Sequence, residues 1–70
     1  MSPDKLVRMA NQISKFFATQ SRTSAPQAVA DHLTKFWEPR MREQICAHWQ
    51  QGGAGLDPIA KDAVDILSSK

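Results

Sequence analysis

The residues of this chain that could act as metal ligands, bases or nucleophiles are few and scattered. Cys46 is the only cysteine, and His32 and His48 are the only histidines. Cys46 and His48 lie two positions apart, so on a helix their side chains diverge by about 200° and cannot share a metal ion. A small buried thiol and two imidazoles at the edge of the core are the simpler interpretation. The sequence therefore predicts no catalytic residue and no metal site.

A glycine-rich run, Gly52-Gly53-Ala54-Gly55, has the composition of a phosphate-binding loop but lacks its other parts. A phosphate loop of the P-loop type needs a following lysine and a serine or threonine, and it follows a strand. None of these is present here. Glycine also takes the left-handed conformation that ends many helices. We therefore predict a helix end and a turn, with no cofactor bound by this chain.

Interaction chemistry is concentrated in the run Phe36-Trp37-Glu38-Pro39-Arg40-Met41-Arg42. Pro39 lacks an N–H and disfavours helical geometry at Glu38, so one helix should end here and another begin. Arginine, tryptophan and methionine are enriched in protein interfaces. The two arginines allow two interpretations. Arg40 could form bidentate bonds with carboxylates of a partner, or Arg40 and Arg42 could pair locally with Glu43 and Glu38 on an exposed surface.

Four helices and no strand are predicted to position these residues. Apolar residues recur every three or four positions in four segments, which is the period of a buried helical stripe. The helices are expected at about residues 3–20, 25–37, 39–51 and 58–68, in a small all-α bundle that forms one domain over residues 1–70. Ser2-Pro3 and Asp57-Pro58 are typical helix starts. Ser24 and Gln27 have the spacing of a capping box.

Charge and hydropathy exclude several classes of partner. The formal net charge is only +2, from nine Lys/Arg and seven Asp/Glu spread along the chain. Nucleic-acid binders usually cluster their basic residues on one face, so no nucleic acid is expected. No apolar run approaches the roughly 20 residues that a membrane-spanning helix needs. A lone thiol and the lack of a secretory signal favour a cytoplasmic protein.

The chain carries much aromatic surface for its size. A 70-residue chain supports only a small core, and a single cysteine cannot form an internal disulfide. Burying every large aromatic side chain internally would be difficult; these are Phe16, Phe17, Phe36, Trp37 and Trp49. We therefore expect part of this surface to be shared with another chain, and a second copy of the same chain is one candidate.

Several motifs resemble one family in their order and spacing. They are Met9-Ala10-Asn11-Gln12-Ile13, Phe16-Phe17, Val29-Ala30-Asp31-His32-Leu33, Phe36-Trp37-Glu38-Pro39-Arg40-Met41-Arg42 and Gly52-Gly53-Ala54-Gly55-Leu56-Asp57-Pro58. Together they are similar to the delta subunit of the cytoplasmic NAD-dependent formate dehydrogenases that carry molybdenum or tungsten, over nearly the whole chain. The family commonly has aspartate at the position of Glu38. Because aspartate is the better helix cap, this junction should be capped less well here.

The resemblance implies a non-catalytic accessory subunit that docks on the large catalytic subunit of formate dehydrogenase and supports assembly or stability. The metal, iron–sulfur, flavin and NAD sites would belong to the larger subunits. The residues expected to contact the partner are Phe36, Trp37, Pro39, Arg40, Met41 and Arg42, with Gly53 and Leu56 in a second contact. Two alternatives stay open: a transient maturation factor for the metal-containing subunit, and a self-associating helical module that is a homodimer when isolated.

Overall fold

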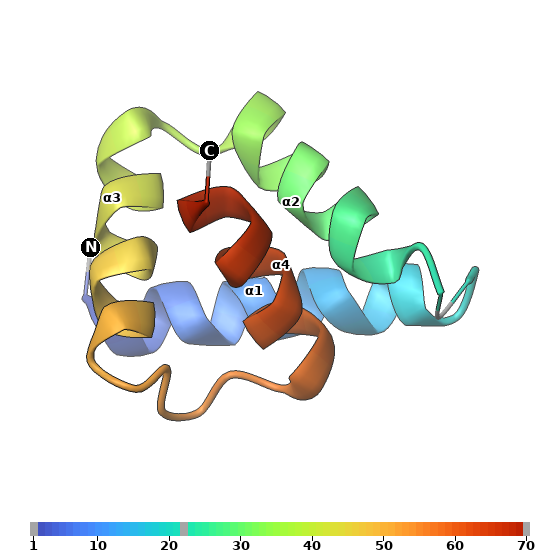
Figure 1. The fold of residues 1–70 in the computed structure, drawn as a ribbon, viewed down its shortest axis with the longest axis horizontal. Coiled ribbons are helices and arrows are strands. Elements are labelled where there is room, and N and C mark those ends of the chain that lie inside the picture. The colour runs from blue at the N-terminus through green and yellow to red at the C-terminus, as the bar shows by residue number, and fades with distance from the viewer. Residues whose placement is uncertain (1, 22, 70) are drawn as a thin grey trace.

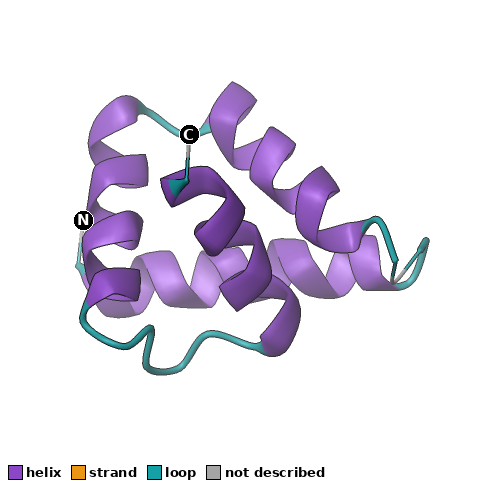
Figure 2. Cartoon of the chain, in the orientation of Figure 1, coloured by secondary structure: helices purple, strands orange, loops and turns teal. Residues whose placement is uncertain are grey.

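The computed structural model describes residues 2–21 and 23–69, and within them the chain forms four helices and no strand (Figures 1 and 2). The helices are α1 (Pro3–Ala18), α2 (Ala25–Phe36), α3 (Pro39–Gln50) and α4 (Pro58–Ser68). The predicted all-α bundle of four short helices is confirmed. The single domain over 1–70 stays a prediction, since residues 1, 22 and 70 lie outside the described residues.

The four prolines mark where the helices begin. Pro3, Pro39 and Pro58 each occupy the first position of a helix, and Pro26 lies in the first turn of α2. A first-turn N–H has no partner within the helix, so proline costs nothing there and its fixed φ suits helical geometry. Each of the four helices thus has a proline at its first or second position.

Helix α4 is the centre of the bundle. It packs against α1, α2 and α3, and in Figure 1 it lies between α2 and α3 and crosses α1. Its buried face carries Ala60, Ala63 and Val64, whose small side chains let neighbouring helices approach closely. The core consists of Leu6, Val7, Ala10, Val29, Ala30, Leu33, Trp37, Ile45, Leu56, Ala60, Ala63 and Val64.

The capping box predicted at the start of α2 is wrong. Ser24 has φ −99° and ψ 0°, not the extended geometry that aims a cap side chain at the helix, and its hydroxyl makes no capping bond. The amide of Gln27 instead donates to the Asp31 carboxylate at 3.0 Å, one turn further along the helix. Helix α1 ends at Ala18, where the Thr19 hydroxyl donates to the Phe16 carbonyl at 2.7 Å.

Candidate interaction surface

Trp37 is part of the core of this chain. It is the C-cap of α2, with φ −84° and ψ 140°, and its N–H donates to the Leu33 carbonyl at 3.0 Å. Only 6% of its surface is exposed. The turn that Pro39 imposes therefore brings the indole inward. At this position the chain's own core covers the aromatic side chain.

The Arg42 side chain binds backbone carbonyls at the α2–α3 junction. Its Nη1 donates to the carbonyl of Trp37 at 2.7 Å and to that of Thr34 at 2.9 Å. These carbonyls lie at the C-terminal end of α2, where the helix dipole favours a cation and the last carbonyls lack helical partners. The guanidinium of Arg42, in the first turn of α3, thus satisfies backbone carbonyls at the C-terminal end of α2. Both of these bonds go to backbone carbonyls and not to the Glu38 carboxylate.

The other residues predicted to contact a partner at the α2–α3 junction differ in how exposed they are. Phe36, Pro39 and Arg40 are exposed, whereas Met41 is half-buried and packs against the core. The run Phe36–Arg42 is therefore not one continuous surface. Consecutive residues at a helix junction point in different directions, and here they divide between solvent and core.

Gly53 and Leu56 hold the loop between α3 and α4 in place. The N–H groups of Gly52 and Gly53 donate to the carbonyls of Trp49 and His48, both at 3.0 Å, and both glycines have positive φ. This is the Schellman arrangement that ends a helix. Gly53 is buried beneath the ring of Trp49, and Leu56 is buried in the core.

Asn11 is the residue whose role sequence reasoning missed. Its amide donates to the Gly55 carbonyl at 2.9 Å and accepts from the Asp57 N–H at 2.9 Å, so it fastens the α3–α4 loop to α1. His48 adds a contact of 2.8 Å between its Nε2 and the Ala54 carbonyl. Asn11 lies within one of the motifs of the family resemblance, which was the only signal in the sequence.

Four rings form a row across α1 and α2. The centroids of Phe16 and Phe17 are 5.3 Å apart, those of Phe17 and His32 5.9 Å, and those of His32 and Phe36 4.6 Å. We call these four residues the aromatic row. Phe16 is 60% exposed and Phe36 71% exposed, and they are the large hydrophobic residues that the described structure leaves at the surface. Contiguous exposed apolar patches mark interaction sites when they are large.

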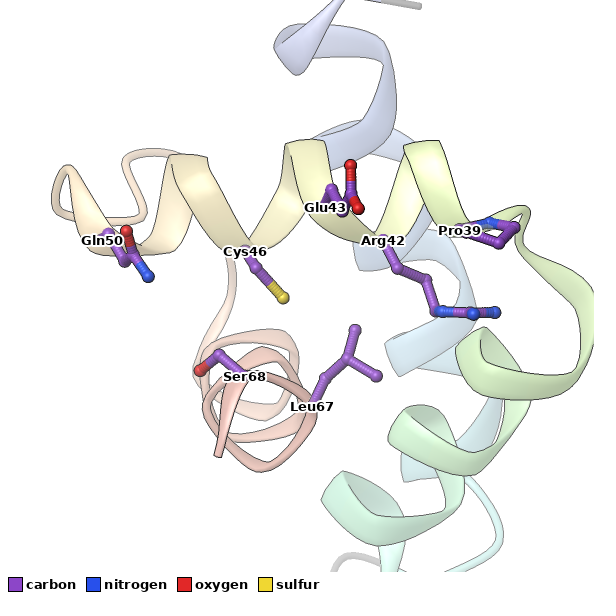
Figure 3. Close-up of a pocket in the computed structure, with 7 residues that line it drawn as sticks. All are labelled: Pro39, Arg42, Glu43, Cys46, Gln50, Leu67 and Ser68. Atoms are coloured by element: carbon purple, nitrogen blue, oxygen red, sulfur yellow. The ribbon is translucent and has the colours of Figure 1, made fainter. Parts of the chain in front are cut away.

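A groove of about 310 Å³ lies between α3 and the C-terminal end of α4 (Figure 3). Cys46 points toward Leu67 across this groove, and Arg42 and Glu43 line it further along α3. Burial raises the pKa of the Cys46 thiol, and the charge of Arg42 lowers it by less. A thiol with a raised pKa is a poor nucleophile at neutral pH. No imidazole or second thiol lines the groove.

The described residues include neither a cluster of metal-ligating side chains nor a helix that could span a membrane. Within residues 2–21 and 23–69, no three His, Cys, Asp or Glu side chains are grouped so that they could hold a metal ion. None of the helices in this part of the chain has the length and apolar character that a membrane crossing requires. The candidate functional site that the described residues present is the aromatic row on α1 and α2.

The fold and the surface define the class of this protein: it is a small all-helical bundle with an exposed aromatic row. A family model described as "NADH-dependant formate dehydrogenase delta subunit FdsD" matches residues 5–64. The chain belongs to this family, as its motifs predicted, and so is a delta subunit of a formate dehydrogenase complex that associates with other subunits. No curated protein and no solved structure gives a significant match.

Proposed function

We propose that this chain is a non-catalytic accessory subunit that docks on the large catalytic subunit of formate dehydrogenase and supports assembly or stability of the complex. The observation that carries the proposal is the pair of exposed phenylalanines, Phe16 and Phe36, in a chain of the delta-subunit family. An exposed phenylalanine gains free energy when a partner removes it from water. The other subunits of the complex are the partners that family membership supplies.

A non-catalytic role is supported by the distribution of reactive groups. His32 lies among the rings of the aromatic row, and His48 contacts a backbone carbonyl in the α3–α4 loop. Cys46 lies apart from both, in the groove between α3 and α4. A catalytic site needs such groups to converge on one reacting atom. In this proposal, the metal, iron–sulfur, flavin and NAD chemistry belongs to the larger subunits, and the free thiol fits a cytoplasmic location.

The proposed contact residues are those of the α2–α3 junction that a partner can reach. Phe36 and Arg40 are exposed, and Pro39 fixes the backbone between them. Trp37 supports the contact from below, because its indole holds the end of α2 against the core. The Arg40 side chain is exposed and bonds to no other described residue, so its guanidinium is available for a carboxylate on the partner.

Co-purification tests the proposal directly. A tagged copy of this chain, co-expressed with the large catalytic subunit, should be recovered with it in a fixed ratio, and the purified active enzyme should retain it. Omitting the chain should lower the yield of intact complex while each remaining complex keeps its turnover rate. Absence of the chain from the active enzyme would indicate a transient maturation factor instead. No recovery with the large subunit would contradict the proposal.

Arg40→Glu tests the second part of the contact. If Arg40 pairs with a carboxylate in the complex, reversing its charge should weaken binding by about 2–5 kcal/mol. Arg40→Gln is the matched control, because it removes the charge without introducing repulsion. Unchanged binding of both variants would show that Arg40 is an ordinary surface residue.

A further inference from the structure

Asn11 makes the hydrogen bonds that join distant parts of this chain. Its amide, on α1, bonds to the Gly55 carbonyl and the Asp57 N–H, which lie 44 and 46 positions away. The other side-chain hydrogen bonds of the described residues span three to eight positions. The core cluster is built from apolar residues, and apolar contacts have no preferred direction. Asn11 thus supplies a directional contact between α1 and the start of α4.

Helix α4 carries two apolar rows, and the row with the smaller side chains faces the core. Ala60, Ala63 and Val64 are buried, whereas Ile59 and Ile66 are half-buried beside them. Successive residues on a helix are about 100° apart, so a rotation of about this size would turn the two isoleucines inward. A larger apolar side chain gains more free energy when it is buried. Hydrophobicity alone therefore does not select the face that α4 presents to the core.

The α3–α4 loop is a permissive connection to this helix. Gly52, Gly53 and Gly55 all have positive φ, and glycine takes positive or negative φ with little difference in energy. Such a loop can lead into α4 from more than one direction. Asn11 removes this freedom, because its amide holds Gly55 and also Asp57, the N-cap of α4, each at 2.9 Å. The two bonds together fix where α4 begins on α1 and in which direction the chain enters it.

We infer that Asn11 selects one packing of α4 among those that the apolar surfaces of the bundle allow. The buried Leu56 keeps the loop against the core, while the Asn11 amide sets the position and rotation of the helix that follows. A satisfied polar group can specify a unique packing, and cores lose their uniqueness before they lose stability. Without this amide, the four helices persist but α4 samples more than one arrangement. The inference concerns the chain by itself and does not depend on the proposed docking.

Asn11→Leu in the full-length chain tests the inference. Leucine is close to asparagine in size and favours a helix, but it removes both hydrogen bonds. Far-UV circular dichroism should stay within about 10% of the wild-type signal, because the helices persist. Near-UV circular dichroism, to which Trp37 and Trp49 contribute, should fall roughly twofold or more, and the dye ANS should bind. Amide NMR cross-peaks of residues 51–68 should broaden or split.

Thr34→Val is the matched control. It also removes a side-chain hydrogen bond and keeps the size of the side chain, but this bond is local, from the Thr34 hydroxyl to the Ala30 carbonyl at 2.9 Å. The variant should keep the near-UV signal of the wild type and a single set of NMR cross-peaks. An equal loss of near-UV signal in Thr34→Val would overturn the inference, because any side-chain hydrogen bond would then have the same effect.

Two results with Asn11→Leu would also overturn the inference. A wild-type near-UV signal with one set of cross-peaks would show that the apolar contacts are sufficient to fix α4. Loss of the far-UV and near-UV signals together would show that Asn11 contributes stability and not register. No partner is present in these measurements, so neither result bears on the proposed function.

Discussion

Replacing Glu38 by aspartate should stabilise the fold. The N-cap of α4, Asp57, shows in the same chain how an aspartate caps a helix at such a position. Glu38 and Asp57 are both N-caps followed by proline, and their backbone angles are similar. Glu38 has φ −65° and ψ 153°, and Asp57 has φ −74° and ψ 168°. The Asp57 carboxylate accepts from the Ala60 N–H at 2.7 Å, whereas the Glu38 side chain makes no capping bond. The longer side chain of glutamate is poorly suited to reach the N–H three residues on.

Glu38→Asp should therefore form the bond that α3 lacks, from the Met41 N–H to the new carboxylate. An N-cap bond is typically worth about 1 kcal/mol. In a domain of this size that gain raises the thermal midpoint by about 4–8 °C. The reciprocal change, Asp57→Glu, should lower the free energy of unfolding by a similar amount. Urea denaturation followed by circular dichroism measures both.

Two further variants separate the cap from the charge. Glu38→Asn provides a capping oxygen without a charge and should retain most of the gain. Glu38→Gln removes the charge but keeps the length, so it should leave the free energy of unfolding nearly unchanged. If Glu38→Asp is no more stable than Glu38→Gln, the difference between the two caps has no energetic consequence and the reasoning is refuted.

Three other substitutions or conditions test the loop and the groove. Gly53→Ala should destabilise the fold by about 2–4 kcal/mol, because its Cβ would lie 2.7 Å from the Trp49 ring and its φ is +66°; near-wild-type urea denaturation would contradict this. Asn11→Ala should speed hydrogen exchange at the Asp57 amide at least tenfold, since that N–H loses its acceptor; equal protection would show that the loop holds itself. The raised pKa of Cys46 means that the unfolded chain loses the thiol proton first as the pH rises. The free energy of unfolding should therefore fall above about pH 8.5, and Cys46→Ser should remove that slope.

The fold was predictable because its signals are local. Each helix begins near a proline, and three of the four N-terminal positions combine that proline with a serine or acidic cap. The Schellman end of α3 follows from Gly52 and Gly53 alone. These features need only a few consecutive residues, so they can be predicted before the packing is known.

The surface was harder to predict because it depends on the packing of distant helices. Phe36 and Trp37 are neighbours in sequence and similar in hydrophobicity, yet one is 71% exposed and the other 6%. Which of them is buried depends on how the four helices pack around the core, and no local pattern contains that information. The same limit applies to Asn11, whose partners in the α3–α4 loop are 44 and 46 residues away.

The burial of Trp37 changes how the proposed docking should proceed. Had Trp37 been exposed with Phe36, the chain would have lacked a large part of its core until a partner supplied it, and folding would have been coupled to binding. Instead, the indole, Leu33 and Ile45 lie in one internal cluster, and Arg42 closes the α2–α3 junction. The surface left over is the aromatic row on α1 and α2. A prefolded chain with two exposed phenylalanines should bind a partner with a heat-capacity change that reflects burial of the contact surface alone, without the larger change that accompanies coupled folding.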